Sequence, residues 1–210
     1  MRPRIALATV SGRAYYKLVN QLQRKGLPFL SLRPWDPVPL GIKVVVTTNE
    51  ERHLIDHPNV LVLENGSDSA SVVDAALLRV RGKQNYEKVV VGVDPGKTCG
   101  VAILGDASIL ATRGCSSLEE TAKVIVEGLK RFPAAVTVVK IGDGAPAYAR
   151  ELTLLLDEVL PGKTVIEIVS EAGTSRFVNE TTHRRGLRDA MSALEIVGRK
   201  GKTFSRGNSR

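Results

Sequence analysis

At 210 residues, 43% of them apolar and 25% charged, the chain has the composition of a globular protein with a sizeable core, in one large domain or two small ones. No run approaches 18 uncharged apolar residues, so the sequence predicts no membrane span. The first residues lead into a strand-like segment and lack the apolar stretch of a signal peptide, so we expect a cytoplasmic location.

The net charge of +8 is unevenly placed. Residues 1–85 hold 12 Lys/Arg against 7 Asp/Glu, residues 86–197 hold 13 against 15, and residues 198–210 hold five bases and no acid. A slightly acidic middle between basic flanks fits a metal-dependent enzyme that grips a polyanion, because basic surface supplies affinity for phosphates.

The first 85 residues alternate strand-like and helix-like segments, which predicts a small α/β domain with parallel pairing. The expected strands are residues 5–10, 27–32, 42–47 and 60–63. The expected helices are a segment that carries Tyr15 to Leu22 and ends at Gly26, a short one around residues 49–55, and residues 69–80. Ser11-Gly12-Arg13, before the first helix, could bind an anion or be an ordinary N-cap.

After a polar boundary at residues 81–85 the order of elements changes. The expected strands are residues 88–93, 100–104, 108–112, 136–141 and 164–169, and the expected helices are a segment from the Ser117 cap to about residue 131, residues 147–160 and residues 187–197. Gly105-Asp106 predicts a hairpin in which glycine takes the positive φ. Residues 199–210 are polar and basic, which predicts a disordered tail.

The segment from Val89 to Gly100 carries the most informative motif. Gly96-Lys97-Thr98 is like the end of a phosphate-binding P-loop, but Gly92 and Gly96 enclose three residues where that motif needs four. A P-loop also opens a helix, whereas the residues after Cys99 are a short apolar run that leads into the hairpin. The sequence therefore argues against a P-loop.

With Asp94-Pro95-Gly96 at the end of one strand and Gly100 at the start of the next, the segment resembles the RNase H-like superfamily, and within it the RuvC Holliday-junction resolvases and the YqgF-type proteins. The predicted order, three strands and then helix–strand–helix–strand–helix, is also that superfamily's order. The resemblance implies an RNase H-like catalytic domain over residues 86–198, with a mixed five-stranded sheet and flanking helices. It leaves the α/β domain of residues 1–85 without a role.

The resemblance also implies a set of carboxylates at strand ends and on the last helix. Asp94 ends the first strand and Asp143 the fourth. Glu171 follows the fifth strand in Ser-Glu-Ala-Gly-Thr-Ser, which looks like the Asp-Glu-Arg-x-Thr-Thr element of the YqgF-type proteins, and Asp189-Ala190 matches the Asp-Ala of the family's final helix. Cutting a phosphodiester with divalent ions needs several acidic oxygen ligands at one spot. These four acids are therefore the expected catalytic and metal-binding residues, for Mg²⁺ or Mn²⁺.

Each acid also has an ordinary explanation. Asp94 and Asp143 lie beside residues typical of turns, and Glu171 could be a solvated loop residue. Asp189 could be a first-turn acid that favours the helix dipole, although it lines up with Ala193 on a largely apolar flank, where a carboxylate needs a partner.

The chain departs from the resolvase pattern at two points. The RuvC resolvases carry Glu on the fourth strand, whereas Asp143 is shorter and lies one step later. Their last helix has two acids three residues apart, and this chain has Gly186 at the earlier position, with His183 just upstream as a replacement. These departures put a complete metal site in doubt.

Five residues beside the expected site are candidates for contact with nucleic acid. They are Lys97, Thr98, His183, Arg184 and Arg185. The basic segment that holds the last three could equally be an exposed, solvated loop.

Together these features predict a Mg/Mn-dependent endonuclease, a hydrolase of structured nucleic acid like a Holliday-junction resolvase, with branched DNA favoured and structured RNA as the other substrate. Family and substrate symmetry lead us to expect a homodimer. The alternative is a catalytically inactive RNase H-fold protein that binds nucleic acid. A sugar-kinase or actin-like phosphotransferase shares the Asp-x-Gly hairpin but usually needs two such domains and far more chain.

The two cysteines, Cys99 and Cys115, have neither CxxC nor Cys/His metal spacing. They flank the predicted hairpin and could therefore lie close together. The sequence leaves open whether they are reduced thiols or a disulfide.

Overall fold

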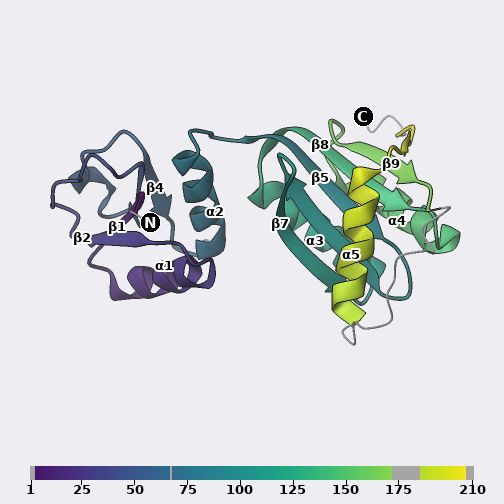
Figure 1. Ribbon diagram of the computed structural model, residues 1–210, viewed down its shortest axis with the longest axis horizontal. Helices are drawn as coiled ribbons and strands as arrows, with labels where there is room; N and C mark the ends of the chain where they lie inside the picture. Colours follow the sequence, from purple (N-terminus) through teal and green to yellow (C-terminus); the bar gives the residue numbers. More distant parts are fainter. Residues whose placement is uncertain (1–2, 67, 172–184, 207–210) are drawn as a thin grey trace. The chain divides into compact units, whose positions relative to one another are not determined.

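The computed structural model describes residues 3–66, 68–171 and 185–206, and for residues 185–190 it describes the backbone only. The chain divides into two compact units, Met1–Asn85 and Tyr86–Arg210 (Figure 1). The expected α/β class is confirmed, with a parallel sheet in the first unit and a mixed sheet in the second.

The first unit is built on four parallel strands in the order β2-β1-β3-β4. The strands are β1 (Ile5–Ala8), β2 (Phe29–Leu32), β3 (Val44–Thr48) and β4 (Val60–Leu63), and the helices are α1 (Gly12–Arg24) and α2 (Ser69–Val80). The short helix expected at residues 49–55 is only a 3₁₀ turn, η1 (Arg52–Leu54).

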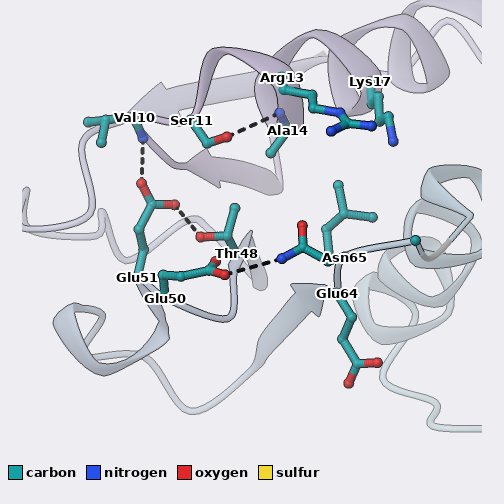
Figure 2. A pocket seen from close by; sticks show the side chains of 12 residues that line it. Val10, Ser11, Arg13, Ala14, Lys17, Thr48, Glu50, Glu51, Glu64 and Asn65 are labelled. Carbon is teal, nitrogen blue, oxygen red and sulfur yellow. Dashed lines mark hydrogen bonds between the residues drawn. The ribbon is translucent and has the colours of Figure 1, made fainter.

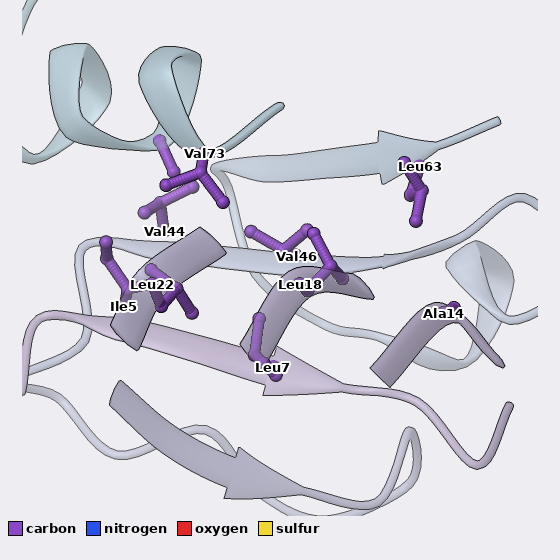
Figure 3. Packing of buried hydrophobic residues seen from close by; sticks show 10 residues of the cluster. Ile5, Leu7, Ala14, Leu18, Leu22, Val44, Val46, Leu63 and Val73 are labelled. Carbon is purple, nitrogen blue, oxygen red and sulfur yellow. The ribbon is translucent and has the colours of Figure 1, made fainter. Parts of the chain in front are cut away.

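The two helices of the first unit cover one face of its sheet. Ala14, Leu18 and Leu22 follow one another at four-residue spacing on α1 and are buried against β1 and β3. Val73 of α2 completes this cluster (Figure 3). A second cluster, which includes Ile42 and Ile55, packs on the strand residues of opposite parity. Loop residues thus contribute to the packing on the other face of the sheet.

The second unit has a six-stranded sheet in the order β10-β9-β8-β5-β6-β7. Its strands are β5 (Tyr86–Asp94), β6 (Cys99–Gly105), β7 (Ser108–Cys115), β8 (Ala134–Gly142), β9 (Val165–Val169) and β10 (Lys202–Thr203). Its helices are α3 (Leu118–Arg131), α4 (Pro146–Val159) and α5 (Arg185–Gly198). Strands β5, β8 and β9 are parallel, so their carboxyl ends lie at one edge of the sheet.

Helix α5 lies on one face of this sheet, and α3 and α4 lie on the other (Figure 1). Gly92 of β5 makes the close approach of α5 possible, because a Cβ there would collide with the carbonyl oxygen of Ala193. The ammonium of Lys140 on β8 binds the carbonyl oxygens of Val197 and Arg199 at the carboxyl end of α5. The second half of α5 is therefore fixed over β5 and β8.

Two expectations for the end of the chain are wrong. The mixed sheet has six strands rather than five, because β10 pairs antiparallel with β9. Residues 199–206 of the expected disordered tail are ordered in part by Arg206, whose Nε donates to Asp157 Oδ1 at 2.6 Å. The same guanidinium donates to the carbonyl oxygens of Asp157 and Leu160 and so satisfies acceptors at the end of α4.

The hairpin between β6 and β7 forms where the sequence predicts it, but glycine does not supply the turn. Asp106 and Ala107 have positive φ values of 46° and 65°, whereas Gly105 is the last residue of β6. A Cβ on Gly105 would collide with the Tyr86 ring and with Leu110, so glycine is needed there for space. The Asp106 carboxylate accepts the backbone N–H groups of residues 87 and 88, which holds the turn.

Cys99 and Cys115 lie directly opposite each other in the β6–β7 ladder, as their positions beside the hairpin predict. Both are buried, free thiols. Burial raises the pKa of the Cys115 thiol.

Within the ranges that the structure describes, no helix combines the length and the apolar character needed to cross a bilayer.

Candidate functional site

Three of the four predicted acids lie at the carboxyl ends of three adjacent strands, and we call this set the carboxylate edge. It consists of Asp94, Asp143 and Glu171. Asp94 is the last residue of β5, Asp143 directly follows β8, and Glu171 lies two residues after β9. All three are half-buried.

Asp143 and Glu171 are linked by hydrogen bonds. The backbone N–H of Glu171 donates to Asp143 Oδ1 at 2.9 Å, and the backbone N–H of Gly144 donates to Glu171 Oε1 at 3.2 Å. The Asp143 N–H in turn donates to the carbonyl oxygen of Val169 at 3.0 Å. The two acids are therefore held in place by the backbone that follows β8 and β9.

Glycines make room for the Glu171 carboxylate. A Cβ on Gly142 would collide with Glu171 Oε1, and a Cβ on Gly144 would lie 2.6 Å from Oε2. Real Cβ atoms do not come this close to other heavy atoms, so a side chain at either position would displace the Glu171 carboxylate.

Asp94 lies level with Gly142 on the neighbouring strand, because Val93 of β5 pairs with Ile141 of β8. Side chains alternate along a strand, so Asp94 is on the same sheet face as Gly92, which contacts α5. Gly142 faces α5 as well, since a Cβ there would also meet Ile196. Asp94 and the Glu171 carboxylate therefore share the α5 side of the sheet.

The fourth predicted acid, Asp189, belongs to α5, but its side chain lies outside the described residues. It is one helical turn before Ala193, whose carbonyl oxygen lies against Gly92.

The predicted contacts to nucleic acid are described only in part. Lys97 and Thr98 are exposed in the turn between β5 and β6, close in sequence to Asp94. His183 and Arg184 lie outside the described residues, and for Arg185, the first residue of α5, only the backbone is described.

We tested whether these residues suit the expected Mg²⁺ or Mn²⁺. Among the described residues, no three Asp, Glu, His or Cys side chains come together as a metal centre. Mg²⁺, however, is commonly bound through one or two carboxylates together with waters and substrate phosphates. The hydrogen-bonded pair of Asp143 and Glu171, with the space left by Gly142 and Gly144, fits that mode of binding.

The first unit contains a cleft of about 600 Å³ at the carboxyl ends of β1, β3 and β4 (Figure 2). We call it the first-unit cleft. One wall is the amino-terminal part of α1, with Ser11, Arg13 and Lys17, and the other is formed by the segments after β3 and β4, with Thr48 and Asn65. In the sheet, β2 lies on one side of β1, and β4 lies on the opposite side of β3, so the connections after β1 and after β3 run in opposite directions. Ligands commonly bind at such a switch point of a parallel sheet.

Two hydrogen bonds to the Glu51 carboxylate hold the cleft together. The Val10 N–H donates to Oε1, and the Thr48 hydroxyl donates to Oε2, each at 2.8 Å. Burial acts to raise the pKa of Glu51, but these bonds and one with Thr9 outweigh it and hold the pKa below its usual value. Glu51 is therefore an ionised structural link between the ends of β1 and β3.

Sequence reasoning found only part of this cleft. Ser11-Gly12-Arg13 drew attention as an anion site or an N-cap, and Ser11 is an N-cap, because its side chain accepts the Ala14 N–H. The sequence analysis missed Lys17, Thr48, Glu51 and Asn65. The usable signal was the four-residue spacing of Arg13 and Lys17 on a helix without acids.

Comparison with known families places a match in the first unit. Residues 4–80 match the family model of a response regulator receiver-like domain. The match covers well under half of the chain, and the search of curated proteins finds no match. The resemblance to the RNase H-like superfamily, with its RuvC and YqgF-type resolvases, is thereby corrected: the family found is receiver-like and not an RNase H-like nuclease.

Proposed function

We propose that the second unit is a divalent-metal-dependent phosphodiesterase that cuts structured nucleic acid. The observation that supports this best is the carboxylate edge, where Asp94, Asp143 and Glu171 end three adjacent strands. The support comes from these residues and their positions, and it does not depend on a family likeness.

Each acid has a definite part in the proposal. Asp143 and Glu171 provide one or two carboxylates, already oriented by the N–H groups of residues 171 and 144, to hold Mg²⁺ or Mn²⁺. Asp94 adds negative charge on the same face of the sheet, and Asp189 comes from α5. When bound, the ion supplies an activated water and stabilises the leaving oxygen of the phosphodiester.

The substrate is proposed from the surroundings of this edge. Lys97 and Thr98 are exposed directly after the Asp94 strand end, where they can contact a phosphate backbone. His183, Arg184 and Arg185 remain part of the proposed contact surface. Branched DNA and structured RNA are the two substrates proposed; a homodimer and a cytoplasmic location belong to the same proposal.

The test measures cleavage and metal binding separately. The full chain is incubated with four-way junctions, flaps, duplex DNA and structured RNA in Mg²⁺ or Mn²⁺, beside the variants Asp94→Asn and Glu171→Gln. Glu127→Gln removes an exposed acid on α3 and is the matched control. We expect metal-dependent cutting that both site variants abolish and the control retains.

Binding of Mn²⁺ is followed by electron paramagnetic resonance in the absence of substrate. We expect Glu171→Gln to weaken it and Glu127→Gln to leave it unchanged. Binding of nucleic acid without cutting by the unaltered chain, or Mn²⁺ binding that is the same in all variants, would overturn the proposal.

A further inference from the structure

The first-unit cleft carries two positive charges on its α1 wall. Arg13 and Lys17 are one helical turn apart on α1 and lie side by side along the cleft (Figure 2). Neither forms an ion pair with any residue in the described part of the chain. Like charges at this spacing destabilise a helix slightly, and no residue of α1 is acidic.

Three acids line the same cleft, but none of them forms an ion pair with Arg13 or Lys17. Glu51 is only 9% exposed and holds Val10 and Thr48. Glu50 accepts the side-chain N–H of Asn65 at 3.4 Å. The carboxylate of Glu64 points away from the α1 wall (Figure 2). The positive charge of the cleft therefore lies on the α1 wall, and its three acids belong to the segments after β3 and β4.

The shape of the cleft suits a small ligand. Its volume of about 600 Å³ is within the range of small-molecule pockets. It lies at the carboxyl edge of a parallel sheet, beside the amino-terminal end of a 13-residue helix, where the helix dipole favours negative charge. Opposite the cations, the Asn65 side chain presents an amide group that can orient a sugar or a base.

We propose that the first-unit cleft binds a small phosphate monoester, with the phosphate between Arg13 and Lys17 and the polar remainder toward Asn65. A monoester carries up to two negative charges near neutral pH, which matches the two cations on the α1 wall. The guanidinium of Arg13 can pair with two phosphate oxygens at once, and Lys17 adds a second charge. The cleft lies wholly within the first unit, so this proposal stands apart from the proposed phosphodiesterase.

The test is isothermal titration calorimetry of the full chain with inorganic phosphate, ribose 5-phosphate and adenosine 5′-monophosphate. Ribose and adenosine are the uncharged controls. The variant Arg13→Gln/Lys17→Gln removes both cations, and Arg24→Gln removes an exposed cation at the far end of the same helix. We expect the double variant to weaken binding of the two phosphate esters by at least about tenfold, since charge-assisted hydrogen bonds are lost, and Arg24→Gln to leave it unchanged.

The dependence of affinity on pH and on salt gives a second test of the proposal. Affinity is expected to fall below about pH 6, where a monoester loses its second charge, and to fall with rising salt. Trp35, the chain's one tryptophan, lies in the first unit, so the unfolding transition of its fluorescence reports whether each variant keeps that unit folded. Lys17→Glu, a single charge reversal, replaces the double variant if that one unfolds.

Several results would overturn the proposal. They are no binding of any phosphate ester, equal binding of ribose and ribose 5-phosphate, and unchanged binding in the folded double variant. Displacement of adenosine 5′-monophosphate by a single-stranded oligonucleotide at lower concentration would also overturn it, because the cleft would then serve a polymer. The Glu171→Gln variant is expected to keep its affinity for the phosphate esters, so this proposal is tested separately from the proposed phosphodiesterase.

Discussion

The carboxyl edge of the first unit's sheet and that of the second unit's sheet follow the same rule of construction but present different charged groups to a ligand. In both, parallel strands bring side chains distant in sequence to one edge. The first edge presents Arg13 and Lys17 on its α1 wall, while the buried Glu51 carboxylate accepts structural hydrogen bonds from Val10 and Thr48. The second presents Asp143 and Glu171, positioned by backbone N–H groups and by glycines. Strand order thus fixes where a site lies, and the residues placed there fix what it can bind.

The largest effect is expected from Gly92→Ala, which breaks the second edge alone. The new Cβ would meet the backbone carbonyl of Ala193 and push α5 away from β5, at a cost of about 3 kcal/mol as in other overpacked cores. Urea unfolding followed by circular dichroism measures the loss. The Trp35 transition reports the first unit and should stay unchanged.

Gly114→Ala is the matched control for that change. Gly114 is also in the second sheet, and a Cβ there meets nothing within 4 Å. Its free energy of unfolding should stay within about 0.5 kcal/mol of the unaltered chain. An equal loss in the free energy of unfolding from both substitutions would contradict the close packing of α5 against Gly92.

The next largest loss of stability is expected from Arg206, which follows β10 and forms hydrogen bonds to the end of α4. Arg206→Ala leaves the acceptors of Asp157, Leu160 and their neighbours without their donor, and we expect a loss of about 2 kcal/mol. Urea unfolding of the second unit measures it, and Lys202→Ala, at an exposed position on β10, is the control. Equal stability of both variants would restore the expectation of a disordered tail.

Gly142→Ala tests whether the space that this glycine leaves for Glu171 matters for metal binding. It would displace the Glu171 carboxylate, so Mn²⁺ affinity should fall about tenfold, equivalent to about 1.4 kcal/mol. Gly12→Ala, at the edge of the first unit, meets nothing within 4 Å and should change neither Mn²⁺ nor phosphate affinity. Unchanged Mn²⁺ affinity in Gly142→Ala would show that Glu171 is not a ligand.

The smallest effect tests the structural role of Glu51. Its pKa is lowered in the folded chain, so its contribution to stability is present above the ordinary Glu pKa of about 4.3 and is lost as the pH falls through the lower folded value. Glu51→Gln should therefore cost about 1 kcal/mol at pH 7 and progressively less in acid. The Trp35 unfolding transition at several pH values measures this.

Glu50→Gln is the control, because Glu50 is exposed and makes a longer hydrogen bond of 3.4 Å. A loss of stability in Glu51→Gln that does not change with pH would mean that the shape of the Glu51 side chain, and not its charge, links β1 to β3.

Local signals predicted much of the fold. The helix at residues 69–80 and the strand at residues 60–63 lie where the sequence places them, with Asp68 as the N-cap that fixes the start of α2. The three carboxylates of the second edge were also found, because each follows an apolar strand. Their hydrogen bonding was not, since it depends on backbone groups brought together by strand pairing.

The errors have a common physical cause, which is that long-range packing overrode local composition. Gly105 was expected to take the positive φ, but the Tyr86 ring needs its space and Asp106 takes the turn. The polar tail was expected to be disordered, but the end of α4 offers carbonyl acceptors that Arg206 fills. The first-unit cleft was missed because its second wall comes from residues more than 30 positions after α1 begins. The receiver-like match falls in this same unit, to which the sequence analysis gave no role.

The most direct measurement of the contrast between the two edges is calorimetric titration of one set of variants with both Mn²⁺ and adenosine 5′-monophosphate. We expect Glu171→Gln to lose Mn²⁺ binding and keep nucleotide binding, and Arg13→Gln/Lys17→Gln to do the reverse. Loss of both ligands in either folded variant, or of neither ligand in both, would contradict two separate sites for ligands of opposite charge.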